Sequence, residues 1–213
     1  SLVGDANKTN ISQSFTTGSV SGVYNYVGSL LGRARSSSIS QSFSTGSVSG
    51  NDNVGGLVGY ADESSISQSF STGHISGNSN TGGIIGKRIG GIVTASYWAT
   101  DTSGQSQAYG DDSIPDTDKD KGLPLATLQC PTVSDDADCA AITLFEGWGE
   151  SLNVDGSAVW DFGGANQLPA LRFSETVSYG DSDADGILDQ DDGFPFIAIV
   201  DLTDTDGDGR PDE

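Results

Sequence analysis

The chain has 213 residues and a formal net charge of −21, from 9 basic and 30 acidic residues. Thirty glycines, no methionine and a first hundred residues rich in Ser, Thr and Asn argue against a helical bundle, because these residues favour turns over helices. The charge argues against a nucleic-acid partner, since binding phosphates requires clustered Lys and Arg. Cations are the expected partners.

An internal repeat of about 27 residues fills residues 1 to about 100. The segment Ile11-Ser12-Gln13-Ser14-Phe15 returns at residues 39–43 and 66–70, and in weaker form at 93–97, in steps of 28, 27 and 27 residues. The leading apolar residues within a repeat are nine apart, as in Leu57, Ile66 and Ile75. The one longer step comes from an extra residue between Gly22 and Val27.

Three segments of nine residues predict an all-β fold, a three-sided parallel β-solenoid (β-helix) with about 27 residues per coil. Stacking would bury side chains that a single coil cannot bury, and backbone hydrogen bonds would join the coils. The glycines that follow the repeated Phe are expected to form corners with positive φ; they are Gly18, Gly46 and Gly73. Two ladders are predicted across the coils: Ile11, Ile39, Ile66 and Val93, and Phe15, Phe43, Phe70 and Tyr97.

The repeats resemble the GLUG-motif repeats of bacterial adhesin-like surface proteins. The resemblance rests on Gly56-Leu57-Val58-Gly59 and Gly83-Ile84-Ile85-Gly86, each followed by the Ser-rich segment. Ser96-Tyr97-Trp98 and Trp160-Asp161-Phe162 are similar to the segments that end such arrays, which implies a cap. A cap is also expected physically, because an open last coil exposes unpaired strand edges.

Three regions are predicted: a GLUG-like β-solenoid over 1–100, a loop-rich cap over 101–176, and an acidic tail over 177–213. In the cap we expect a short helix near 124–129. Cys130 and Cys139 predict a local disulfide if the compartment is oxidising, with two free thiols as the alternative. Trp148 and Trp160 are interpreted as core residues, the alternative being an exposed pair that stacks on sugars.

The tail contains a predicted calcium loop over 181–192. Oxygen donors fall at loop positions 1, 3, 5, 9 and 12, with Gly at position 6 and a carbonyl donor at position 7, which is calcium-loop spacing. The predicted ligands are Asp181, Asp183, Asp185, Ile187, Asp189 and Asp192. The alternative is a solvated acidic linker.

A second loop repeats positions 1 to 9 of the first and has no ligand at position 12 within this chain. Its predicted ligands are Asp204, Asp206, Asp208 and Asp212. Both loops resemble the thrombospondin type-3 repeats of secreted bacterial proteins. A third alternation, Asp116, Asp118 and Asp120, has Lys121 where Gly belongs and is a weaker calcium candidate.

The function expected from these features is that of an extracellular adhesin-like module, secreted or on the bacterial cell surface. A rigid rod would present repeated faces to a glycan or protein receptor, and calcium would stiffen the linker that follows. The alternatives are a subunit of a self-assembling filament or matrix, and a non-catalytic accessory region of a secreted polysaccharide-active enzyme. The longest apolar stretch, 194–200, is too short to cross a bilayer, so no membrane insertion is expected of this segment.

Catalysis is not expected, because the coils offer few paired carboxylates or bases. Asp62 and Glu63 are interpreted as forming a surface charge pairing with Arg33 and Arg35. A single rank of threonines gives only a weak argument for ice binding; these are Thr17, Thr45 and Thr72. The polar and aromatic corner residues are interpreted either as ligand contacts or as solvated turns; these are Tyr24, Tyr26, Asn51, Asn53, His74, Asn78 and Asn80.

Overall fold

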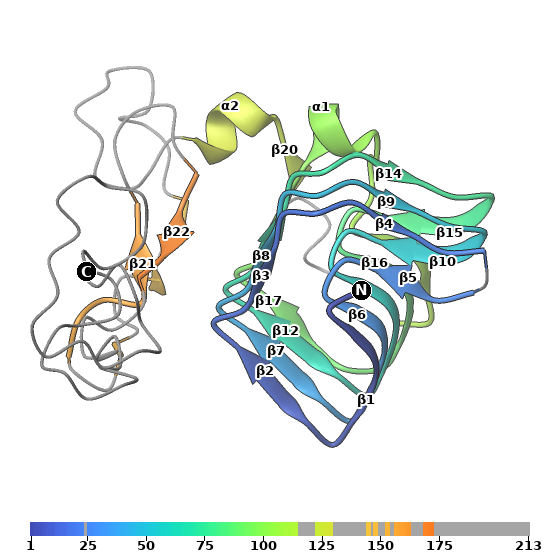
Figure 1. Cartoon of the computed structure of the whole chain (residues 1–213), viewed down its shortest axis with the longest axis horizontal. Helices are drawn as coiled ribbons and strands as arrows, with labels where there is room; N and C mark the ends of the chain where they lie inside the picture. Colours follow the sequence, from blue (N-terminus) through green and yellow to red (C-terminus); the bar gives the residue numbers. More distant parts are fainter. Residues whose placement is uncertain are drawn as a thin grey trace, which may run out of the picture. The chain divides into compact units, whose positions relative to one another are not determined.

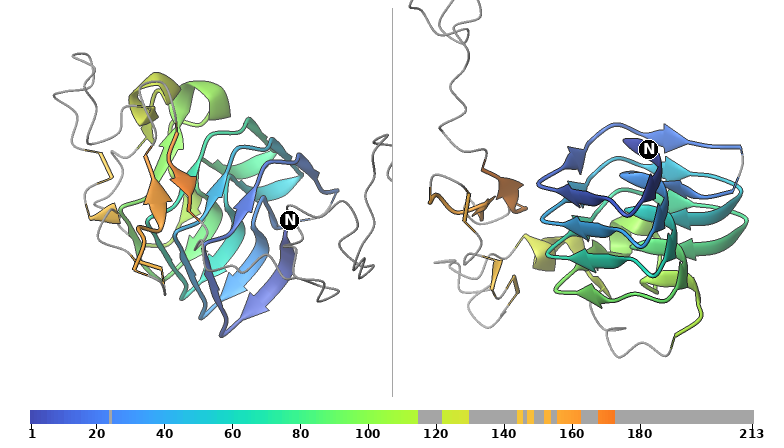
Figure 2. Two further views of the ribbon diagram at one scale, coloured as in Figure 1. Left: turned by 60° about the vertical axis from the view of Figure 1, so that its left-hand side comes forward. Right: turned by 90° about the horizontal axis from the view of Figure 1, so that it is seen from below.

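The computed structural model describes residues 1–23, 25–114, 122–129, 144–145, 147–148, 152–153, 156–162 and 168–172. It confirms the predicted all-β fold, with parallel sheets stacked as a β-solenoid of about four coils (Figure 1). Figure 2 shows the coils lying directly on one another. The chain divides into two compact units, residues 1–151 with 158–172, and 152–157 with 173–213.

Five parallel sheets run along the solenoid, and each of the first three coils contributes one strand to every sheet. Sheet A contains β1 (Val3–Asn7), β6 (Leu31–Arg35), β11 (Val58–Asp62), β16 (Ile85–Ile89) and β19 (Tyr109–Asp112). Sheet B contains β2 (Asn10–Ser12), β7 (Ser38–Ser40), β12 (Ser65–Ser67) and β17 (Val93–Thr94). Sheet C contains β3 (Phe15–Thr16), β8 (Phe43–Ser44), β13 (Phe70–Ser71), β18 (Tyr97–Ala99) and β20 (Gly122–Leu123).

Two shorter parallel sheets complete each coil, so the predicted nine-residue segments are broken into five short strands. Sheet D contains β4 (Val20–Ser21), β9 (Val48–Ser49) and β14 (Ile75–Ser76). Sheet E contains β5 (Val27–Gly28), β10 (Asp52–Gly55) and β15 (Ser79–Gly82). The remaining elements are α1 (Thr100–Ser103), α2 (Leu125–Leu128) and an antiparallel pair of β21 (Trp160–Asp161) and β22 (Ala170–Leu171). The position of α2 confirms the helix predicted near 124–129.

The register of the coils follows the sequence repeat. Ile39 pairs with Ile11 and Ile66, and Ile66 pairs with Val93, as predicted. From the second coil on, the leading apolar residues of all three segments are buried, and they form two separate clusters. The larger cluster includes Leu30, Leu57, Ile84 and the Ile39 ladder, whereas the smaller one consists of Val27, Val48, Val54, Ile75 and, at its edge, Val20.

Glycine contacts bring sheet E directly onto sheet A and so divide the core in two. A Cβ on Gly55 would lie 2.6 Å from the backbone nitrogen of Gly86, and one on Gly82 would lie 2.6 Å from that of Gly110. A Cβ on Gly28 would lie 2.6 Å from the nitrogen of Gly59. No side chain fits at these crossings, because real Cβ atoms do not approach other atoms that closely. The paired glycines of the repeat are therefore packing residues.

The corners differ from the prediction in which residues take positive φ. Gly18, Gly46 and Gly73 do not adopt it. The left-handed conformation falls instead on three sets of equivalent non-glycine residues, which are Lys8, Ser36 and Glu63; Gln13, Gln41, Gln68 and Ala95; and Tyr26, Asn53 and Asn80. Gly46 and Gly73 are required for a different reason: a Cβ there would overlap the carbonyl oxygen of the glycine one coil earlier.

Buried serines bridge the coils at the corner between sheets B and C. The hydroxyl of Ser69 accepts a hydrogen bond from the backbone N–H of Ser42 at 3.2 Å and donates to the carbonyl of Ser67 at 2.8 Å. Ser42 and Ser96 make the same pair of bonds in their own coils. A backbone N–H that faces away from the ladder is satisfied in this way, which accounts for the repeated Ser.

The aromatic ladder forms as predicted but faces outward. Phe15, Phe43 and Phe70 stack with centroids 5.2 and 5.0 Å apart, and Tyr97 follows in register. These rings do not join the core inside the coils. Phe43, Phe70 and Tyr97 pack instead with a second group of buried side chains, which includes Leu128, Phe145, Trp148, Val159 and Trp160. Burial along the ladder rises from Phe15, which is 43% exposed, to Phe70, which is 1% exposed.

Candidate functional surface

The outer face of sheet A collects side chains from successive coils into a charged and aromatic row. Asp5, Arg33, Tyr60, Lys87 and Asp111 are paired in register along the five strands. The alternate positions of these strands, such as Ala34 and Ala61, point into the core. At a strand spacing of about 4.8 Å, the row is about 19 Å long.

Ion pairs lie at both ends of this row. Arg33 Nε lies 3.0 Å from Asp5 Oδ2, and Arg35 Nη2 lies 3.2 Å from the same oxygen. At the other end Lys87 Nζ lies 2.7 Å from Asp111 Oδ2. Asp62 and Glu63 were the predicted partners of Arg33 and Arg35, but both guanidinium groups instead share the carboxylate of Asp5. Of the predicted pairs, Asp62 and Arg35 lie in register on neighbouring strands.

The ion pairs change the acid–base properties of their members. A hydrogen bond from Arg33 holds the pKa of the Asp5 carboxyl below its usual value, and the same contact raises the pKa of Arg33. A hydrogen bond to Asp111 likewise raises the pKa of Lys87. All three groups are open to solvent, so each pair adds little to stability. Their main effect on the surface is to fix charged donors and acceptors in place.

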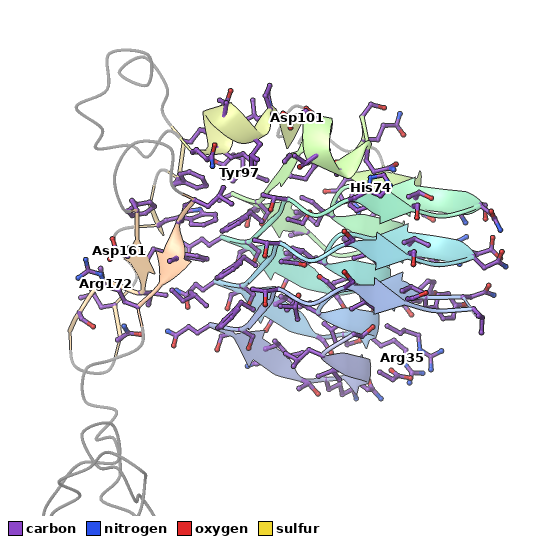
Figure 3. All side chains as sticks on the ribbon, turned by 45° about the horizontal axis from the view of Figure 1, so that its top comes forward. Arg35, His74, Tyr97, Asp101, Asp161 and Arg172 are labelled. Atoms are coloured by element: carbon purple, nitrogen blue, oxygen red, sulfur yellow. The ribbon has the colours of Figure 1, made fainter. Side chains whose placement is uncertain are left out.

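Two tyrosines lie between the ion pairs. The rings of Tyr26 and Tyr60 have centroids 4.9 Å apart, and the guanidinium carbon of Arg33 lies 5.9 Å from the centre of the Tyr26 ring. Arg35 projects from this side of the solenoid, away from Tyr97 and the aromatic ladder (Figure 3). Tyr26, Arg33, Tyr60 and Lys87 are called the tyrosine face below.

The other predicted corner residues make contacts within the repeat. The amide nitrogen of Asn78 donates to Asn51 at 2.6 Å, and that of Asn80 donates to Asn53 at 2.9 Å. His74 accepts a backbone hydrogen bond from Val48 through its carbonyl and is exposed. These asparagine ladders are structural, whereas Tyr24 lies outside the described residues.

Trp148 and Trp160 are core residues, as predicted, and they cover the aromatic ladder. Both are buried, with ring centroids 4.6 Å apart. Trp160 packs at 6.2 Å from Phe43 and 6.0 Å from Phe70, and the indole N–H of Trp148 donates to the carbonyl of Ala95 at 3.2 Å. An exposed sugar-stacking pair at these two positions is therefore wrong.

The predicted disulfide and calcium sites lie outside the described residues. This applies to Cys130 and Cys139, to both Asp-rich loops of the tail, and to the alternation at 116–120. Among the described residues, no group of three or more His, Cys, Asp or Glu side chains is placed to hold a metal ion. No helix in the described part of the chain is long and apolar enough to cross a membrane.

The row on sheet A was not predicted, although the repeat contains a signal for it. The residue that follows the last Gly of the Gly-rich motif is Asp5, Arg33, Tyr60 or Lys87 in successive coils. Its position is as regular as that of the apolar residues, whereas its chemistry changes in every coil. Aligning the repeats on this variable position would have placed these residues in one row.

The fold and the glycine contacts define a parallel β-solenoid in which the repeated Gly-rich motif brings sheet E into contact with sheet A. Residues 50–76 match the family model described as the GLUG motif. This segment runs from the end of sheet D in one coil to sheet D in the next. No curated protein and no solved structure matched the chain.

Proposed function

We propose that this chain is an extracellular adhesin-like module in which a rigid solenoid holds binding surfaces in fixed register. The observation that carries the proposal is the row on sheet A, where neighbouring coils offer different charged or aromatic side chains at the same position. A scaffold with nearly constant inward residues and varied outward residues favours recognition of an extended ligand. The match of residues 50–76 to the GLUG motif supports the same reading.

An array of glycans and extracellular matrix proteins tests this proposal. The full chain, with calcium present, is expected to bind at least one member of the array, and the same chain after heat unfolding serves as the control. Absence of binding by folded protein to every member would overturn the proposal. Release of reducing ends or unsaturated products from a polysaccharide would instead identify an enzyme.

Calcium binding by the tail is the second part of the proposal, and it rests on the donor spacing of residues 181–192. Close carboxylates repel one another when no cation is present, so an ion would neutralise the segment and restrict its conformations. Asp185→Asn and Asp189→Asn together should reduce calcium binding in titration calorimetry, whereas Asp116→Asn with Asp118→Asn should leave most of it. A melting temperature unaffected by chelator, together with no calcium-binding heat, would contradict the proposal.

A further inference from the structure

The tyrosine face has a feature that the folding of the coils does not require. Its two rings lie side by side on the outside of the solenoid, and Tyr26 is 37% exposed. Tyr26 comes from the only coil with an extra residue at this corner, in the insertion 23–26. Tyr26 nevertheless lies in register with Asn53 and Asn80, so the ring beside Tyr60 is a replacement at a regular position of the repeat.

Tyr26 adopts a backbone conformation that is unfavourable for a tyrosine. Tyr26 has φ of 70°, and the equivalent corners of the next two coils hold Asn53 and Asn80, with φ of 51° and 49°. Asn tolerates this left-handed conformation far better than Tyr does. Asn at this position would also extend the amide ladder that joins Asn80 to Asn53. A residue that strains the backbone while leaving its side chain exposed is a candidate functional residue.

The charges around the two rings indicate the kind of ligand. Arg33, Arg35 and Lys87 bring three positive charges, while Asp5, Asp111 and Asp62, which is paired in register with Arg35, bring three negative charges. The face is thus locally neutral within a chain of net charge −21. The chain as a whole would repel an anionic ligand. A neutral ligand with many hydroxyls can use both the cationic donors and the anionic acceptors.

We propose that the tyrosine face binds a neutral glycan chain that lies across the coils. The apolar face of a sugar ring would stack on Tyr26 and Tyr60, whose rings combine an apolar surface with a polar hydroxyl. Arg33 and Lys87 would donate hydrogen bonds to sugar hydroxyls, one on each side of the tyrosines. This inference rests on the proposed function as a binding module and identifies its site and ligand class.

Titration of the full chain with labelled tyrosine rings tests the site. The chain has six tyrosines, so ring signals in NMR spectra can be assigned by single substitution. The probes are cellohexaose, maltohexaose, xylohexaose and mannohexaose as neutral glycans, and polygalacturonate as an acidic one. At least one neutral probe is expected to shift the signals of Tyr26 and Tyr60 and leave the other tyrosines unchanged.

Two substitutions use residues that the repeat already accepts. Tyr26→Asn introduces the residue of the equivalent corners, and Tyr60→Arg introduces the residue of the preceding coil in the same row. Each should weaken binding about tenfold, the effect of losing one stacking contact. The melting temperature of Tyr26→Asn should stay the same or rise, whereas Tyr60→Arg places a cation between Arg33 and Lys87 and should lower it slightly. Val23→Ser, which changes an 80% exposed residue of the same insertion, is the matched control and should bind normally.

Three outcomes would overturn the inference. One is the absence of ring shifts with every neutral probe, another is binding of polygalacturonate alone, and the third is unchanged affinity in both tyrosine variants. Array binding that persists in the tyrosine variants would overturn this site and leave the adhesin proposal standing. Absence of all array binding by the wild-type chain would contradict the adhesin proposal itself.

Discussion

Arg88 and Asp112 form a buried, bidentate ion pair in the last full coil of the solenoid. Arg88 Nε and Nη2 lie 3.0 and 2.9 Å from the two carboxylate oxygens of Asp112, and the side chains are 4% and 17% exposed. Arg88 occupies the position held by Ala34 and Ala61 in earlier coils, so its side chain points into the core of the solenoid. Its guanidinium carbon lies 4.1 Å from the centre of the Tyr109 ring.

Loss of Asp112 should be more harmful than loss of Arg88. Asp112→Ala would leave the more deeply buried charge without its carboxylate, which costs about 3–5 kcal/mol of unfolding free energy in comparable sites. Arg88→Ala restores the residue of the earlier coils and leaves a carboxylate that water can reach, so its cost should be smaller. Urea unfolding of both single variants and the double variant measures this, and equal losses would contradict it.

Gly73 and Gly18 occupy the same corner in different coils and should respond differently to alanine. A Cβ at Gly73 would overlap the carbonyl oxygen of Gly46, whereas a Cβ at Gly18 would meet nothing within 4 Å. Gly73→Ala should therefore lower the unfolding free energy by about 2–3 kcal/mol, as overpacking does. Gly18→Ala is the matched control and should be neutral or stabilising by up to about 1 kcal/mol. Equal effects in thermal melts would show that the corner is not closely packed.

Trp160 should contribute strongly to stability because it covers two rings of the aromatic ladder and contacts Trp148. Trp160→Ala should cost about 3–5 kcal/mol, the range for removal of a large buried side chain. It should also expose Phe43 and Phe70 and increase binding of a hydrophobic dye. The control is Phe15→Ser, at the exposed end of the same ladder, where a much smaller loss is expected. An unfolding free energy that Trp160→Ala leaves unchanged would contradict this packing.

Asp5 should make the first coil sensitive to acid. Its pKa is lowered in the folded chain, so its ion pairs contribute stability above the unfolded pKa of about 3.9 and lose it as pH falls through the folded value. The melting temperature of Asp5→Asn should be slightly below that of wild type at neutral pH, and the two should converge once the pH falls below the lowered pKa of Asp5. Added salt should narrow the gap. A difference in melting temperature that does not change with pH would show that ionisation of Asp5 is not its cause.

The register of the solenoid was predictable because its signals are local and repeated. Leu57, Ile66 and Ile75 are nine apart, and the same spacing in each coil leaves one stacking register that buries all of them. The extra residue at 23–26 falls at a corner, where one more residue does not shift any ladder. Repetition therefore compensates for the weak pattern of strands only two to five residues long.

The direction of the Phe ladder was not predictable from alternation. Ile39 and Phe43 are four residues apart, so a continuous strand would point both inward. Gln41 lies between them in the left-handed conformation and reverses the alternation, with the result that Ser42 is buried and Phe43 faces outward. Glutamine is not a residue that signals such a turn. The row on sheet A was missed for another reason, because its residues share a position and not a chemical type.

Each coil is held to the next by backbone hydrogen bonds that run along the solenoid, and this arrangement has a mechanical consequence. A pulling force applied at one end of the described coils loads the bonds of the outermost coil first, so the coils should detach one at a time. Each detached coil of about 27 residues would release roughly 90 Å of extended chain. A chain that connects two bodies in this way would lengthen in equal steps and absorb work under load. The coils that remained stacked would keep their outer side chains in place.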